Sequence, residues 1–143
     1  MSSQAPPSGA SKKLSPRDIV EACNDLMIQG RSLEALERYI SPQFIEHSPR
    51  IPNGDRDGLR QFLKDDGWLE SDSPKLKQMQ FYTDRVIASG EFVVTHMHVV
   101  TGPSEPVLVL MDIFRVQNGL IVEHWDVVQP EPEQPANTRY KMY

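Results

Sequence analysis

The sequence of 143 residues contains a single cysteine, Cys23, and no long hydrophobic run. One cysteine cannot form a disulfide within the chain. No apolar stretch approaches the ~20 residues that a membrane-spanning helix needs. The first residues, MSSQAPPSGASKK, also lack the apolar segment of a secretory signal. We therefore expect a cytoplasmic protein that is not inserted in a membrane.

Basic residues are also few. Lys and Arg total 15 against 20 Asp and Glu, which gives a formal net charge of −5, and no stretch concentrates the basic residues. Nucleic acids and anionic membranes are bound through clustered positive charge. The composition therefore argues against either of them as the main partner.

Several catalytic motifs are missing. The sequence has neither a glycine-rich phosphate-binding loop nor a G-x-S-x-G nucleophile motif. Cys23 shares an apolar helix face with Ile19, Leu26 and Met27, which is typical of a core residue and not of a nucleophile. We expect no nucleotide chemistry, no covalent catalysis and no bound cofactor.

The length suits one domain, and both ends of the chain differ from its middle. Residues 1–13 are rich in Ser, Pro, Ala and Gly, and residues 131–143 are polar and rich in Pro. Such segments have little to bury. We predict a folded domain over residues 14–130 with a tail at each end.

The first half of the domain reads as helices. A helix beginning near Ser15 has an N-cap, a proline in the first turn and an acidic Asp18. RSLEALERYI predicts a second helix and DRDGLRQFLKDD a third, with a short strand in PQFIEHSP between them.

The second half has the period of strands. Four runs of alternating residues, at 75–90, 91–102, 106–117 and 120–130, are separated by turn-forming residues. This order predicts an α+β fold in which three N-terminal helices pack on a curved, mostly antiparallel sheet.

Ionisable residues interrupt three of these strands. His124 and Asp126 lie two apart in LIVEHWDVV, His96 and His98 lie two apart in VVTHMHVV, and Asp112 stands within VLVLMDIF. Residues two apart share a face of a strand. An unpaired carboxylate costs several kcal/mol to desolvate. These groups therefore lie in water or around a cavity that supplies partners.

Whether Asp112 joins His124 and Asp126 depends on the turn between their strands. A two-residue loop at Asn118-Gly119 sets Asp112 opposite Trp125, on the other face. A three-residue loop sets Asp112 opposite His124. Periodicity alone leaves both open.

Three stretches then resemble a known family: YISPQFIEHSPRIPNGDRDGLRQFL, FVVTHMHVV and MDIFRVQNGLIVEHWDVVQ. They are similar to the SnoaL-like polyketide cyclases of the nuclear transport factor 2-like superfamily, over roughly residues 14 to 130. The resemblance implies a cone-shaped fold enclosing a pocket, and a homodimer. Its members include cyclases, ketosteroid isomerases, epoxide hydrolases and proteins that only bind.

The resemblance also implies roles for individual residues. His47 takes the position of the ketosteroid isomerase base, and Asp112 that of the protonated aspartate that donates to an oxyanion, which favours the three-residue loop. By similarity to limonene epoxide hydrolases, His96, His98 and Asp126 lie around the same cavity, although the arginine of those enzymes is absent. Phe62, Trp68 and Phe114 are expected to give apolar contacts to a substrate.

Each residue has a plainer alternative. His47 is an exposed histidine, Asp112 an ionised partner of an Arg or His, and His124 with Asp126 a hydrogen-bonded pair. A metal site built on His96 and His98 has permissive spacing only, and we expect no metal.

We expect a cofactor-independent enzyme that isomerises or cyclises an apolar carbonyl compound. His47 or the His124/Asp126 pair would act as the base and Asp112 as the oxyanion donor. The alternatives are a non-catalytic binding or dimerisation module and a hydratase or epoxide-hydrolase-like activity.

Overall fold

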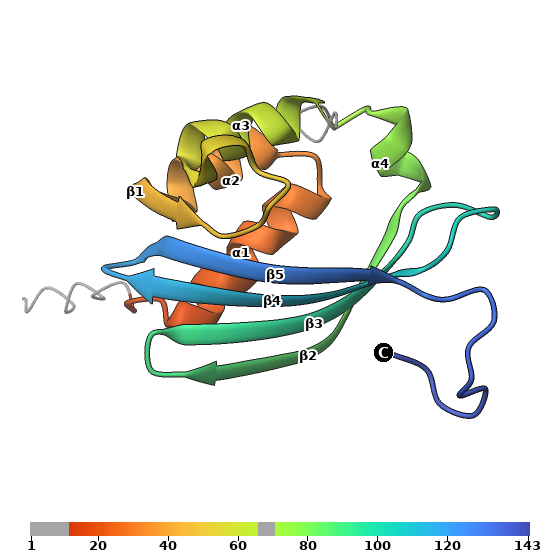
Figure 1. Cartoon of the computed structure of the whole chain (residues 1–143). Coiled ribbons are helices and arrows are strands. Elements are labelled where there is room, and N and C mark those ends of the chain that lie inside the picture. The colour runs from red at the N-terminus through yellow and green to blue at the C-terminus, as the bar shows by residue number, and fades with distance from the viewer. Residues whose placement is uncertain (1–11, 66–70) are drawn as a thin grey trace, which may run out of the picture.

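The computed structural model describes residues 12–65 and 71–143, and it shows helices packed against one face of a curved five-stranded sheet (Figure 1). The predicted α+β fold is confirmed. The helical elements are α1 Pro16–Ile28, α2 Ser32–Tyr39, the 3-10 turn η1 Pro52–Gly54, α3 Arg56–Asp65 and α4 Pro74–Gln78. The strands are β1 Ile40–Glu46, β2 Gln80–Ser89, β3 Phe92–Val100, β4 Leu108–Gln117 and β5 Leu120–Pro130.

Helix α1 begins as its sequence predicts. The Ser15 hydroxyl accepts from the Asp18 amide at 3.1 Å, and the Asp18 carboxylate accepts from the Ser15 amide at 2.9 Å. This capping box and Pro16 in the first turn fix the residue at which the helix starts. The helix then buries Ile19, Val20 and Leu26 against the sheet.

The sheet has the order β1-β5-β4-β3-β2. Strands β2 to β5 form the predicted antiparallel meander, and β1 joins its edge parallel to β5. This parallel pairing places Glu46, the last residue of β1, beside His124. A segment from the helical half of the chain therefore reaches the strands that carry the ionisable residues.

The start of β2 differs from the prediction. Residues Pro74–Gln78 form α4, and the strand begins only at Gln80. Ser73 caps α4 by accepting from the Leu76 amide at 3.5 Å, and Pro74 follows at the first position. This Ser-Pro start signal explains why the segment is helical despite its alternating pattern.

The loop between β4 and β5 also corrects an expectation. Asn118 and Gly119 have φ of 51° and 78°, and Gln117 faces Leu120, which is the two-residue turn and not the favoured three-residue one. A bulge follows: Val116 pairs with Ile121 but Arg115 pairs with Glu123, so Val122 has no partner of its own. This extra residue changes which side chains share a face. Asp112 therefore lies opposite Asp126.

The core fills one end of the space between helices and sheet. Val20, Leu36, Val93 and Ile121 are completely buried there, close to the β2–β3 and β4–β5 turns. Towards the other end of the sheet, side chains such as Leu110 line a cavity instead. The fold is thus solid at one end and hollow at the other.

Candidate functional site

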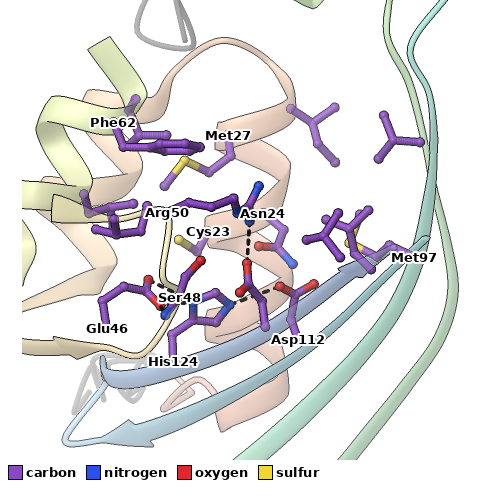
Figure 2. Close-up of a pocket in the computed structure, with 18 of the residues that line it drawn as sticks. Cys23, Asn24, Met27, Glu46, Ser48, Arg50, Phe62, Met97, Asp112 and His124 are labelled. Atoms are coloured by element: carbon purple, nitrogen blue, oxygen red, sulfur yellow. Dashed lines mark hydrogen bonds and ion pairs between the residues drawn. The ribbon is translucent and has the colours of Figure 1, made fainter. Parts of the chain in front are cut away.

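The cavity lies between the inner face of the sheet, α1, α3 and the loop that follows β1 (Figure 2). Its volume is about 410 Å³, a size typical of small-molecule sites. Most of its wall is apolar, with contributions from Met27, Phe62, Met97, Leu110, Phe114 and Val128. The acidic side chains and His124 lie on the part of the wall formed by β1, β4 and β5.

His124 bridges two carboxylates in this charged part. Its Nδ1 lies 2.9 Å from both carboxylate oxygens of Glu46, and its Nε2 lies 3.1 Å from Oδ1 of Asp112. The side chains of Glu46 and Asp112 are 2% and 12% exposed. Both ring nitrogens thus face acceptors, an arrangement that suits the imidazolium form.

The protonation of His124 follows from these contacts. Burial alone disfavours the charged ring, but the hydrogen bonds to Asp112 and Glu46 and their negative charges outweigh it, so the pKa of His124 rises from 6.5 to about 9. At neutral pH the ring is positively charged and both N–H groups donate to carboxylates.

Asp112 accepts hydrogen bonds through both oxygens. Oδ1 faces His124, and Oδ2 accepts from the hydroxyl of the buried Thr95 at 3.4 Å. This geometry matches the plainer alternative for Asp112, a carboxylate paired with a histidine. The expected role of Asp112 as a donor to an oxyanion stays a prediction.

Asp126 forms a second ion pair, with Arg50. The Nη2 atom of Arg50 lies 2.5 Å from Oδ2 of Asp126, whose side chain is 6% exposed. Among the residues that the structure describes, Oδ1 of Asp126 has no hydrogen-bond partner. Asp126 thus contributes to the cavity wall a carboxylate oxygen that has no partner among the described residues and can act on a bound molecule.

Two polar groups of the cavity are not among the residues that the sequence predicts for the site. Glu46 and Ser48 line the cavity, and the Ser48 amide donates to Glu46 Oε1 at 2.9 Å. The Ser48 hydroxyl is buried and has no partner within the described part of the chain. The sequence does indicate the position of Glu46. It lies two residues after the buried Phe44 on the same strand, so alternation predicts that its side chain also points inward.

His47 lies on the outer face of the sheet, which corrects its expected place at the cavity. Its ring stacks on Trp125 with centroids 4.7 Å apart, and its Nε2 lies 2.8 Å from Glu123 Oε1. His47 stands between two residues that point inward, so it points outward. The plainer alternative, an exposed histidine, describes it: the side chain is 42% exposed.

His96 and His98 are also on the outer face, and the expectation that they surround the cavity is wrong. Nδ1 of His96 lies 2.8 Å from Nη1 of Arg85, and Nδ1 of His98 lies 2.8 Å from Asp84. Met97 takes the inner face between them. The two histidines are two residues apart in β3, so their side chains point to the same face of the sheet. That face is directed away from the helices.

The remaining expected residues divide as follows. Asp112, His124 and Asp126 converge on the cavity wall, and Phe62 and Phe114 line it. Phe114 also stacks on His124, with centroids 4.7 Å apart. Trp68 lies outside the described residues. The roles of these residues in binding or catalysis stay predictions.

Cys23 is a core thiol that touches the cavity. It is buried on α1, and burial raises the pKa of its thiol to about 12. At that pKa the nucleophilic thiolate is scarce near neutral pH. Within residues 12–65 and 71–143, no group of three or more His, Cys, Asp and Glu side chains is placed to hold a metal ion.

A sequence profile of the SnoaL-like domain matches residues 20–124, most of the chain. The chain belongs to the SnoaL-like domain family. A search of proteins with curated functions found no match.

Solved structures share the fold. IdmH, a candidate polyketide cyclase from Streptomyces antibioticus, is 20% identical with a TM-score of 0.58, over 80% of this chain and 92% of its own. A candidate ketosteroid isomerase from Kribbella flavida is 16% identical with a TM-score of 0.62, over 87% and 84%. An NTF2-like protein of unknown function from Cytophaga hutchinsonii is 11% identical with a TM-score of 0.64, over 85% and 96%.

These likenesses support the NTF2-like fold for this member of the SnoaL-like family. No helix in the described part of the chain has the length and apolar character needed to cross a membrane.

Proposed function

We propose that this SnoaL-like protein is an enzyme that carries out general acid–base chemistry on an apolar carbonyl compound held in the cavity. The reaction would be an isomerisation or an intramolecular aldol-type ring closure. One observation carries the proposal: the Asp126 side chain is 6% exposed and lines a largely apolar cavity, and one of its oxygens has no hydrogen-bond partner among the described residues. Two similar structures, named as a candidate polyketide cyclase and a candidate ketosteroid isomerase, support the reaction class.

Asp126 is the base in this proposal. Its Oδ1 takes a proton from the carbon next to a carbonyl group, and the electrons of the broken C–H bond form an enolate. Returning the proton to a different carbon completes an isomerisation. Attack of the enolate carbon on a second carbonyl of the same molecule closes a ring. A positioned base of this kind typically contributes ~10²–10⁴-fold to the rate.

His124 does not suit the role of base. Both of its nitrogens are engaged by carboxylates, and its pKa of about 9 keeps it protonated near neutral pH. We assign it the role of a fixed positive charge that orients Glu46 and Asp112. His47 is excluded by position, because it lies on the outer face.

The test is exchange of a carbon-bound proton with solvent. We would incubate the protein with a panel of bicyclic and tricyclic enolisable ketones in D₂O and follow loss of the α-proton signal by NMR. Asp126→Asn should slow exchange of any accelerated ketone by ~10²–10⁴-fold. Asp25→Asn, on the exposed side of α1, should leave the rate unchanged. Equal rates for wild type and Asp126→Asn would contradict the proposal.

A binding module is the second candidate, and one observation favours it: the charged groups on β1, β4 and β5 already pair with one another or with Arg50. Such a protein would bind the same ketones without accelerating exchange. Calorimetric titration beside the exchange assay separates the two candidates.

We also propose that two copies of the chain associate through the outer face of the sheet. Several large apolar side chains are exposed there, namely Tyr82, Ile87, Met111, Ile113 and Val127. An apolar patch of this kind on a soluble domain often marks an interface. Light scattering of wild type and Ile113→Lys should show a dimer and a monomer; a monomeric wild type would contradict this proposal.

A further inference from the structure

Arg50 occupies an unusual place in the cavity. It comes from the loop after β1, and its side chain lies between Phe62 and Met27 on one side and the charged wall on the other (Figure 2). The guanidinium carbon is 5.6 Å from the centroid of the Phe62 ring, while Nη2 reaches Asp126. The guanidinium thus stands where the apolar and charged parts of the cavity meet.

Most N–H groups of this guanidinium are uncommitted. Asp126 is its sole hydrogen-bond partner among the residues that the structure describes, and the side chain is 49% exposed. A guanidinium has five N–H donors in one plane. Arg50 can therefore keep Asp126 and still offer donors to a bound molecule.

The charged groups of β1, β4 and β5 that share the wall with Asp126 cannot supply such donors. Both N–H groups of His124 are directed at Glu46 and Asp112, and both oxygens of Asp112 accept hydrogen bonds. An enolate formed over Asp126 needs a positive or hydrogen-bonding group beside its oxygen. Arg50 is the cation next to the free oxygen of Asp126.

We propose that Arg50 is a further catalytic residue, which binds the substrate oxygen that becomes negative when Asp126 removes the α-proton. The inference rests on the proposed function. In this step the C–H bond breaks and its proton goes to Asp126 Oδ1. The electron pair forms a C=C bond, and the carbonyl π pair moves to oxygen.

Charge stays balanced around Arg50 during the step. Before it, the guanidinium faces the Asp126 carboxylate; after it, Asp126 is neutral and the negative charge is on the enolate oxygen. The same cation neutralises both, without a change in the net charge of the site. A charge of this kind that is already in place stabilises a transition state because it needs no reorganisation when the negative charge forms. The ligand class that fits is a flat apolar ring system with an anionic oxygen.

The experiment uses 2-naphthol, whose anion mimics an enolate and whose fluorescence distinguishes the neutral and anionic forms. Asp126→Asn mimics the protonated base, so it frees Arg50 from its ion pair. We expect Asp126→Asn to bind the naphtholate about 10-fold or more tightly than wild type does, the size of a hydrogen bond between charged groups. Adding Arg50→Gln should abolish this gain, and Arg50→Lys should keep part of it.

Two controls make the result specific. The neutral ether 2-methoxynaphthalene should bind equally to Asp126→Asn and to the double variant. Arg115→Gln breaks an arginine–glutamate pair of similar length, 2.7 Å, on the outer face, and should leave naphtholate binding unchanged. Thermal unfolding checks that each variant is folded.

Three results would overturn the inference. These are no naphtholate binding, equal binding by wild type and Asp126→Asn, or a gain that survives Arg50→Gln. Failure of the proposed function can be distinguished from failure of this inference, because it is measured by α-proton exchange. If Asp126→Asn does not change the exchange rate, Asp126 is not the base, and this conclusion does not depend on the naphtholate measurements.

Discussion

His124 and His47 lie on opposite faces of the same end of the sheet, and each contacts a glutamate. The His47 amide even donates to the His124 carbonyl at 3.0 Å. Yet the side chain of His124 is 14% exposed and contacts two carboxylates, whereas that of His47 is 42% exposed and contacts one. The same residue type is a buried charge on one face and a surface group on the other.

The comparison teaches that the alternation of side chains along a strand decides which ionisable residues point into the cavity. On the inner face, charges are shielded from water and their interactions are strong. On the outer face, solvent weakens them. The experiments below compare the two faces, from the largest expected effect to the smallest.

Removing His124 should destabilise the protein far more than removing His47. His124→Ala leaves Glu46 and Asp112 buried without their cation, which typically costs about 3–5 kcal/mol. His47→Ala removes an exposed ion pair and a ring contact, worth about 1 kcal/mol or less. Urea unfolding at pH 7 measures both. Equal losses would show that the faces do not differ as described.

The free energy of unfolding should fall as pH rises from 6.5 through 9. The pKa of His124 is raised from 6.5 to about 9 in the folded state. Its stabilising contribution is therefore fully present below pH 6.5 and is lost as the ring deprotonates near 9.

Thermal unfolding between pH 6 and 10 follows this loss, with His124→Gln as the test variant and His98→Gln as the outer-face control. The fall should flatten in the former and persist in the latter. A fall that is as steep in His124→Gln would assign it to other groups.

Ser48→Ala should have the smallest effect on stability. The buried hydroxyl has no partner among the described residues. Its removal therefore loses no hydrogen bond and removes the cost of burying an unpaired polar atom. We expect a change between zero and about 1 kcal/mol of stabilisation. Thr95→Ser is the matched comparison, because it keeps the hydroxyl that donates to Asp112. A clear loss of stability in Ser48→Ala would reveal a hydrogen bond there.

The fold was largely predictable because its signals are local. The capping box at Ser15 and the alternation in β3 to β5 are read from neighbouring residues, and the structure has those elements. Helix α4 was missed because its Ser73-Pro74 start lies inside an alternating segment. In this segment the helix-start signal of Ser73-Pro74 outweighs the strand-like alternation of apolar and polar residues.

The site was predictable only in part, because it depends on how the strands pair and therefore on which side chains of neighbouring strands share a face. Asp112, His124 and Asp126 do converge, but through the bulge at Val122, which no turn rule indicates. The family resemblance predicts His47, His96 and His98 at the cavity, whereas their position in the alternation of their own strands directs them to the outer face. Arg50 lies in the loop after β1. Its contact with Asp126 on β5 is a long-range tertiary contact that no sequence pattern indicates.

The most direct test of the account measures α-proton exchange of one accelerated ketone with two variants side by side, His47→Gln and Asp126→Asn. The account places the chemistry on the inner face. It predicts that His47→Gln exchanges at the wild-type rate while Asp126→Asn is slowed by ~10²–10⁴-fold. The reverse pattern, with a slow His47→Gln and an unaffected Asp126→Asn, would contradict it.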